Sequence, residues 1–433
     1  MLAFIKRFIS QKYFNTVPMT EGDYKKSQRM IIAATPTASI INLLISGSFL
    51  VGYLTHLGAS SQYSAIMGAI PQLGCLLQLF SPYLFERLKH RKLLICISCF
   101  LFRFLVGTII IVPYLVSKEG SRLAVIMIIY TTAFMIAGFV TPGLSSWYLD
   151  IAPESGRGRF LAIKDIISMS ATSLVSMLIG KMLDYYGMLH KPMVGFTIMF
   201  SFVILLSFVD FLLISNIDEP KEKNHVVQLS LFDLILTPLK DKVFRRFILF
   251  LSVWNFAVQF SVSIIPIFML NYIGLSYSYI SAVTVAGNVF GMISIYLWGR
   301  LADKTSWRFL IRICGFLIAC CYFGWFLVNL SNAKWLVVLL QVMMVCCNGA
   351  FHMASNNIQY NAASDEGKTA YLGVTQAIAC VISFIGAVLG SKLLKVFEGM
   401  DLQISIIGAD AIQFLFLITS VLLIDALFLL KRK

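Results

Sequence analysis

Twelve long apolar segments constrain this chain more than any other feature of its sequence. Each provides roughly the ~20 residues of helix that cross a ~30 Å hydrocarbon core. The composition agrees, since 58% of the 433 residues are hydrophobic and only 13% are charged. We therefore expect an all-α membrane protein with twelve transmembrane helices and no large soluble domain. The segments are 31–56, 61–85, 93–116, 123–147, 160–186, 192–217, 246–271, 276–298, 309–330, 336–358, 370–397 and 404–430.

The basic residues predict how these spans are oriented. The chain has 35 Lys and Arg against 21 Asp and Glu. Twelve spans put both termini on one side; if that side is the cytoplasm, 27 basic residues lie inside, seven outside and Arg103 within a span. This is the positive-inside pattern, whereas a nucleic-acid partner requires a continuous basic surface. We expect a multi-pass protein of the plasma or inner membrane, with both termini cytoplasmic and no nucleic-acid partner.

The chemical motifs of enzymes are missing between the spans. All nine cysteines fall inside apolar segments, so we interpret them as free thiols packed between helices. No Ser-His-Asp set, metal-ligand cluster, phosphate-binding Gly loop or nucleotide motif is found outside the spans. We expect no enzyme, no metal, no cofactor and no ATP-driven pump.

The longest polar interruption divides the spans into two groups of six. Its middle, Leu229 to Leu239, is apolar enough to lie along the inner membrane surface. The predicted organisation is an N-terminal cytoplasmic segment 1–30, a first bundle 31–217, a linker 218–245, a second bundle 246–430 and a tail 431–433.

The two halves resemble each other in sequence. The segments 82–91 and 299–308 each place a carboxylate, a base and a distal arginine at the same spacing. Same-direction repeats of six spans predict two bundles related by pseudo-two-fold symmetry about an axis along the membrane normal. The matched residues are Glu86, Arg87 and Arg91 in the first copy, and Asp303, Lys304 and Arg308 in the second.

These residues carry a resemblance to a known family. The stretch Gly299-Arg-Leu-Ala-Asp303-Lys304 resembles the loop after the second span of each half in the major facilitator superfamily, and 153–159 resembles that superfamily's loop after the fourth span. With the twelve-span layout, the resemblance covers essentially the whole chain. The first copy departs from the family pattern at Pro82 and Glu86, where the family usually has Gly and Asp. The resemblance implies a secondary transporter that works by alternating access.

The resemblance also implies an inner gate. In that family the loop carboxylate accepts hydrogen bonds from a helix N-terminus or an arginine of a neighbouring span, an arrangement that elementary electrostatics favours. We predict Glu86 and Asp303 as acceptors; the alternative is that these charges only orient the spans. The donor candidates are Arg87, Arg91, Arg157, Arg159, Lys304 and Arg308.

Polar stripes mark the candidate solute site on the spans that the resemblance places at the cavity. Asn255, Gln259 and Ser263 recur every four residues, so they share one helical face, as do three residues of the tenth span. Such residues avoid lipid and line either a water-filled path or a helix contact; both alternatives remain open. The candidate solute-contacting residues are Asn42, Trp254, Asn255, Gln259, Asn288, Asn348, His352, Asn356 and Gln376.

Trp254 does not fit an interfacial aromatic belt. Eight residues into its span, it is expected ~12 Å deep by helix rise. Its ring either stacks on a sugar or base, or packs between helices.

Between their ends, seven of the spans expected at or beside the cavity contain no Asp, Glu, Lys or Arg: the first, second, fourth, seventh, eighth, tenth and eleventh. An ionic solute needs a counter-charge in a low-dielectric site, so we predict a neutral, sugar- or nucleoside-like solute and favour uptake. The alternatives are proton-coupled drug or metabolite efflux, although the fifth span lacks the Gly-Pro of drug antiporters, and a non-transporting receptor.

Two residues are candidates for coupling to H+ or Na+. Asp165 is either a coupling carboxylate or the partner of Lys164, Arg159 or Arg103, and His352 is either a coupling group or a neutral hydrogen-bonded imidazole. Arg103 requires a partner, either Asp165 or Asp210, and we interpret it as structural. We expect a monomer.

Overall fold

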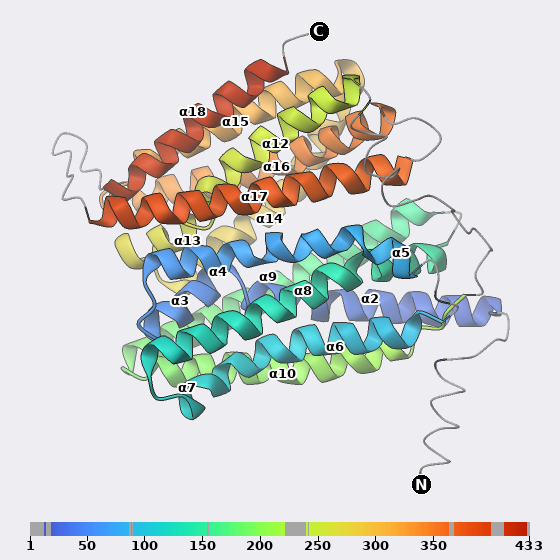
Figure 1. The fold of residues 1–433 in the computed structure, drawn as a ribbon, viewed down its shortest axis with the longest axis horizontal. Helices are drawn as coiled ribbons and strands as arrows, with labels where there is room; N and C mark the ends of the chain where they lie inside the picture. The colour runs from blue at the N-terminus through green and yellow to red at the C-terminus, as the bar shows by residue number, and fades with distance from the viewer. Residues whose placement is uncertain are drawn as a thin grey trace. The chain divides into compact units, whose positions relative to one another are not determined.

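The computed structural model describes residues 13, 19–85, 88, 90–153, 156–220, 240, 242–362, 368–399 and 411–430. Within these ranges every regular element is a helix (Figure 1). The all-α expectation is therefore confirmed. The predicted apolar middle of the linker and the gate residues Glu86 and Arg87 lie outside the described residues.

Helices correspond to the six predicted spans of the first half, and three of these spans are divided into consecutive helices. The first comprises α2 (Glu21–Leu44) and α3 (Gly47–His56). The second comprises α4 (Ser61–Gly74), η1 (Cys75–Leu79) and α5 (Ser81–Phe85). The third comprises α6 (Lys92–Thr108), η2 (Ile109–Ile111) and α7 (Val112–Leu115), and the others are α8 (Glu119–Ile151), α9 (Arg157–Met188) and α10 (Pro192–Ser215).

Helices also correspond to the six predicted spans of the second half. The seventh comprises α12 (Lys242–Val262), α13 (Ile265–Ile267) and the π-helical η3 (Phe268–Tyr272). The next four are α14 (Tyr277–Lys304), α15 (Trp307–Phe326), α16 (Ala333–Ala362) and α17 (Lys368–Glu398). The last comprises η4 (Ala411–Gln413) and α18 (Phe414–Leu429).

Length and apolar composition qualify most of these helices as membrane spans. Among the described residues nine helices pass by themselves, and ten when the bent pair α2 and α3 counts as one. The two remaining predicted spans correspond to α4 with α5, and to the 16-residue α18. The helices are thus consistent with the twelve predicted spans.

Hydroxyl side chains fix where several helices begin. Thr20 Oγ1 accepts from the Asp23 amide at 3.3 Å, and the Asp23 carboxylate accepts from the Thr20 amide at 2.9 Å, which is a capping box. At the start of α14, Ser276 Oγ accepts from the amide of Tyr279 at 3.2 Å. Ser306 caps α15 in the same manner. These caps satisfy amides that a helix leaves unpaired at its first turn.

The first span is broken at a glycine. Gly47 has φ of +54°, a left-handed conformation that glycine adopts without a Cβ penalty. The axes of α2 and α3 differ there by 41°. The parts of this span before and after Gly47 therefore follow different directions.

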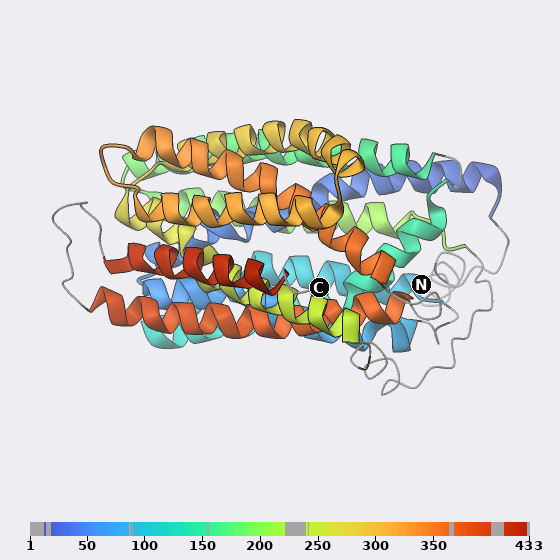
Figure 2. The same ribbon diagram turned by 90° about the horizontal axis from the view of Figure 1, so that it is seen from above.

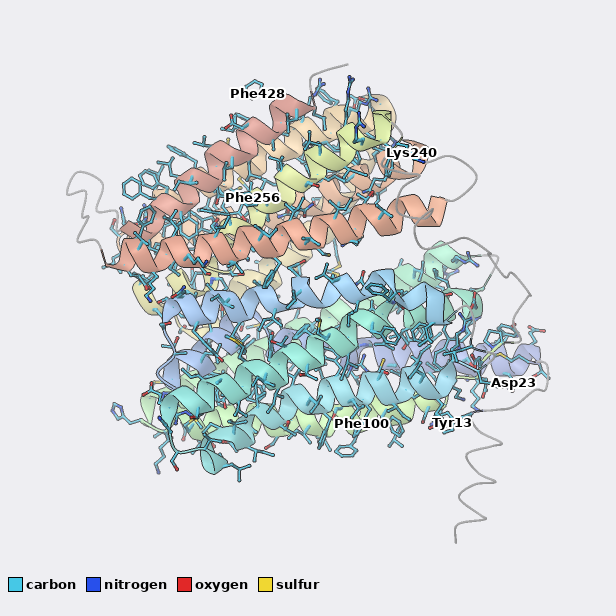
Figure 3. The ribbon with its side chains drawn as sticks, in the orientation of Figure 1. Tyr13, Asp23, Phe100, Lys240, Phe256 and Phe428 are labelled. Atoms are coloured by element: carbon cyan, nitrogen blue, oxygen red, sulfur yellow. The ribbon has the colours of Figure 1, made fainter. Side chains whose placement is uncertain are left out.

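Contacts group the described helices into two compact units. Unit 1 consists of Met1–Ser46, Gly74–Ser176 and Tyr186–Gln228. In it α6 packs against both α8 and α10, and α2 packs against α10 (Figure 1). Phe100 of α6, labelled in Figure 3, lies 5.1 Å from Phe208 of α10 between ring centroids.

Unit 2 consists of Gly47–Leu73, Met177–Tyr185 and Leu229–Lys433. Its long helices of the second half run lengthwise beside one another (Figure 2). α12 packs on α17 so closely that a Cβ at Gly386 would lie 2.6 Å from the carbonyl oxygen of Phe256 (Figure 3). Two pieces of the first half thus group with the second half. The division into bundles 31–217 and 246–430 remains a prediction.

Candidate functional site

A polar face on α12 is the first part of the candidate site. Asn255 and Gln259 are half-buried, and the Asn255 side-chain amide donates to the Leu251 carbonyl at 2.7 Å. Ser263 continues the same face by one more turn. A Cβ at Gly68 of α4 would lie 3.1 Å from Ser263 Oγ, so this end of the face packs against a segment of the first half, within unit 2. The polar face therefore turns toward first-half chain at that end.

α14 has a similar polar face. Its half-buried Thr284 and Asn288 lie within about 60° of Ser281 around the helix, at 3.6 residues per turn. Ser281 contacts α9, because a Cβ at Gly180 would lie 2.8 Å from Ser281 Oγ. Both polar faces thus begin at a contact with a helix of the first half and continue along their own helix.

The other predicted amides differ in burial. On α16 Asn348 is half-buried and donates to the Met344 carbonyl at 2.8 Å, whereas His352 and Asn356 are exposed. Gln376 of α17 is exposed and its amide lies 3.7 Å from Cys380 Sγ; Asn42 of α2 is also exposed. The four exposed side chains therefore lie on an accessible surface: Asn42, His352, Asn356 and Gln376.

Trp254 lies in the packed interior of unit 2. Its indole stacks on Phe351 of α16, with ring centroids 4.2 Å apart and an interplanar angle of 17°. The residue is only 3% exposed. Of the two sequence alternatives, this arrangement matches packing between helices, and we therefore leave Trp254 out of the solute site proposed below.

An ion pair between two buried residues lies in unit 1. Arg103 of α6 pairs with Asp210 of α10, one of the two partners predicted for it, and Thr37 of α2 donates to Asp210 Oδ1 at 2.8 Å. The other predicted partner, Asp165, has a side chain that is 62% exposed and lies 3.3 Å from Lys164 Nζ. Arg103 therefore acts as a structural tie between spans.

A polar network joins the start of α6 to the residues that follow α10. The Glu219 carboxylate accepts from the backbone amides of Arg91 at 2.9 Å and Lys92 at 3.3 Å, so it caps α6. The Arg91 guanidinium donates to Asp150 at 2.6 Å and lies 3.7 Å from Glu219. The adjacent Asp218 carbonyl accepts from the indole of Trp147 at 3.3 Å. Arg91, a predicted gate donor, is thus held within unit 1.

The remaining predicted gate residues lie at helix ends. Asp303 is in the last turn of α14, but its side chain is outside the described part of the structure. The four basic donor candidates that remain are exposed: Arg157, Arg159, Lys304 and Arg308. The gate prediction is neither supported nor contradicted by these positions.

A tight contact joins the opposite ends of the spans. We call it the outer cluster, after the side that the charge distribution assigns to the outside; it consists of Phe49, Gly52, Gly180, Asp184, Tyr277, Ser278 and Ser281. The Asp184 carboxylate of α9 accepts from the backbone amides of Tyr277 and Ser278, each at 2.8 Å. A carboxylate from the first half therefore caps the first turn of α14, and all of these residues belong to unit 2.

Comparison with known proteins identifies the family. The family model described as Major Facilitator Superfamily matches residues 31–391, which is most of the chain. The chain belongs to the major facilitator superfamily. It is accordingly a membrane transporter, as the motif after the eighth span implies. No curated protein sequence matches it.

Solved structures of major facilitator superfamily transporters share the fold at low sequence identity. A bacterial homologue of the human lysosomal transporter Spinster has a TM-score of 0.71 at 14% identity, covering 95% of this chain and 97% of that one. A D-xylose–proton symporter has a TM-score of 0.70 at 12% identity, covering 94% and 98%. A mutant of the nucleoside transporter NupG has a TM-score of 0.68 at 13% identity, covering 93% and 98%.

The carboxylate caps of this major facilitator superfamily chain were not predicted from its sequence. Asp184 carries a recognisable signal, because Ser168, Thr172, Ser176, Gly180 and Asp184 recur every four residues along α9. Such a stripe indicates a close helix contact that ends in a charge. Glu219 carries a weaker signal, since it stands at the start of a charged linker and resembles any solvated acidic residue.

Proposed function

We propose that this transporter moves a neutral polar organic solute, of the sugar or nucleoside class, across the cell membrane by alternating access. Uptake is the favoured direction, and the protein works as a monomer with both termini cytoplasmic. One observation carries the proposal: the polar faces of α12 and α14 hold amides and hydroxyls but no charged side chain, and each runs into a contact with first-half helices.

The amides of α12 and α16 have the chemistry needed for such a solute. Asn255 and Asn348 each give one N–H to their own helix, at 2.7 and 2.8 Å. An amide group offers two N–H donors and an oxygen acceptor, so one donor and the acceptor of each residue stay available to a hydroxyl-bearing solute. The proposed solute contacts are Asn42, Asn255, Gln259, Asn288, Asn348, His352, Asn356 and Gln376.

The pairing of buried charge supports a neutral solute as well. An organic anion bound in low dielectric requires Arg or Lys, and a cation requires a carboxylate. Arg103 is paired with Asp210, and so neither charge is free for an ionic solute. The fold itself is compatible with neutral polar cargo, since solved structures that share it include a nucleoside transporter and a xylose–proton symporter.

A ligand-stabilisation screen of the purified protein tests the proposal. Neutral sugars and nucleosides are expected to raise the thermal unfolding midpoint, whereas cationic dyes and carboxylates are not. A hit is then followed by uptake into vesicles, where transport should saturate. Stabilisation by charged compounds alone would contradict the proposed solute class, and a ligand that stabilises without being transported would favour a receptor.

Coupling to H+ or Na+ is proposed through Asp165 or His352. Both side chains are exposed on the protein surface, which gives an ion access to them. Asp165→Asn and His352→Gln are each compared with the parent for uptake under an imposed ion gradient. Loss of gradient-driven accumulation with retained solute exchange identifies the coupling residue; accumulation by both variants would remove both candidates.

The inner gate stays part of the proposal. Asp303 is the proposed acceptor of the second half and Glu86 that of the first. Arg87, Arg91, Arg157, Arg159, Lys304 and Arg308 are the proposed donors; the exposed ones are free to change partners as the inner ends of the spans separate.

A further inference from the structure

We infer that the bond between the Asp184 carboxylate and the start of α14 is a latch that holds the outer end of the solute path closed. The inference rests on the proposed alternating-access function, but its test needs no solute. All of the contacts that carry it lie inside unit 2.

The latch joins a helix of the first half to a helix of the second through two charge-assisted hydrogen bonds. Tyr277 and Ser278 donate their backbone amides to Asp184 Oδ1 and Oδ2, each at 2.8 Å. The amide of Tyr279 is already satisfied by Ser276 Oγ. The Asp184 carboxylate thus accepts from the two first-turn amides that Ser276 does not cap. It lies at the N-terminal end of α14, where the helix dipole favours a negative charge.

Close backbone contact surrounds these bonds. One turn before Asp184, a Cβ at Gly180 would lie 3.0 Å from the Tyr277 carbonyl oxygen and 3.1 Å from Ser278 Cα. The Tyr277 ring stacks on Phe49 of α3, with centroids 6.3 Å apart and an interplanar angle of 7°, and it also covers Gly52. Because Gly52 of α3 and Gly180 of α9 have no side-chain carbon, both helices approach α14 closely. This contact therefore contains no solute-sized gap.

A second bond lies beside the latch. Thr55 of α3 and Asn271 of η3 are hydrogen-bonded through their side chains, with Oγ1 and Nδ2 3.2 Å apart. Both are exposed, so this pair reports on closure without belonging to the packed contact. Thr55 belongs to the first half of the sequence and Asn271 to the second.

The chemistry of the latch makes it reversible. No ion pair involving Asp184 is present among the described residues, and its partners are two backbone amides. Opening therefore exchanges two hydrogen bonds for bonds to water, and it does not strand a buried cation. A contact of this strength biases the closed state without making it permanent.

Cross-linking of Thr55→Cys to Asn271→Cys in membranes measures closure. The reagent is a short bis-methanethiosulfonate, and a protease site in the linker separates the halves, so that only a cross-link keeps them together on a gel. The chain without the engineered pair corrects for its nine native cysteines. In this background Asp184→Asn is expected to lower the closed-to-open ratio about tenfold, the effect of losing roughly one charge-assisted hydrogen bond, and thereby to slow the initial cross-linking.

Two matched controls separate the latch from general damage. Glu398 also accepts a hydrogen bond at this end, from Tyr272 Oη at 2.7 Å, but both residues lie in the second half; Glu398→Gln should leave the rate unchanged. Gly180→Leu should lower the rate by steric separation of α9 and α14, whereas Gly187→Leu, on the same helix with nothing within 4 Å of its Cβ position, should not.

The possible results decide the inference. Slower cross-linking in Asp184→Asn and Gly180→Leu, with parental rates in both controls, supports it. A monodisperse Asp184→Asn protein that cross-links at the parental rate overturns it, and so does an equal slowing by Glu398→Gln. If Asp184→Asn does not fold, Gly180→Leu tests the same contact with the carboxylate intact. A failed solute screen leaves this result standing, so the two proposals fail separately.

Discussion

The guanidinium of Arg103 on α6 is ion-paired with the carboxylate of Asp210 on α10 inside unit 1. The two side chains are 7% and 0% exposed, and Thr37 of α2 adds a hydrogen bond to the same carboxylate. Three spans of the first half are thereby tied at one buried point. Loss of one partner is expected to destabilise the folded protein strongly, because the other charge is then buried without a counter-charge.

Asp210→Asn is expected to destabilise the protein by about 3–5 kcal/mol, the cost of leaving a buried charge unpaired. Thr37→Val removes only one hydrogen bond and should cost about 1 kcal/mol. The measurement is the thermal midpoint of monodispersity by size-exclusion chromatography. The double variant Arg103→Met with Asp210→Leu should recover more than half of the loss; equal losses for Asp210→Asn and Thr37→Val would contradict the assignment.

Glu219→Gln is expected to lower the thermal midpoint more than Asp150→Asn does. Glu219 is 13% exposed at its side chain and caps two backbone amides of α6, whereas Asp150 is 43% exposed and contributes an ion pair screened by water. Exposed pairs of the second kind are worth ~0–1 kcal/mol. The reverse order of midpoints would show that the cap does not hold the start of α6.

Asn255→Ala and Asn348→Ala are expected to weaken solute binding about tenfold each, as expected for removal of roughly one hydrogen bond to a neutral partner. The readout is the apparent Kd of whichever solute the stabilisation screen identifies. Asn357→Ala is the matched control, because Asn357 makes the same backbone bond on α16, to Met353 at 2.9 Å, one residue away from the polar stripe. Equal effects at Asn348 and Asn357 would assign the amides to helix packing.

Asp303→Asn is expected to slow turnover more than it weakens binding, since a gate carboxylate acts on the exchange between states. Initial uptake rates and equilibrium binding are measured on the same preparation. Asp425→Asn is the control, because Asp425 is an exposed carboxylate near the corresponding end of α18. Parental turnover in Asp303→Asn would leave this motif only an orienting role.

Hydrophobicity made the architecture predictable. A bilayer demands long apolar helices, and all twelve predicted segments correspond to helices in the described chain, with ends shifted by up to about ten residues where polar turns extend a helix beyond the apolar core, as α2 does from Glu21. The family followed from the spaced charges after the eighth span, the segment 153–159 after the fourth span and the twelve-span layout. The partner of Arg103 was narrowed to Asp165 or Asp210, because a buried arginine requires a carboxylate, and the structure pairs it with Asp210.

The partners at helix ends were not predictable in the same way. Whether Arg91 meets Glu86, Asp150 or Glu219 depends on loop paths that hydrophobic periodicity does not encode. The burial of Trp254 was equally open, because an indole beside amides suits a packed contact and a ring-binding site alike. Asp184 was overlooked because a carboxylate near a span end is ordinarily solvated. The stripe that ends in it indicates a helix contact, but not that its partners are backbone amides.

The glycines at 52, 68 and 180 have a consequence for how this transporter varies between individuals and relatives. At each of them a helix of the first half contacts second-half chain closely because glycine has no Cβ. Every substitution there therefore adds side-chain volume to the contact. Substitution can therefore separate the helices at these three contacts by increasing amounts but cannot bring them closer. Variants with Ala and then larger side chains at these positions should form a graded series of wider helix separations.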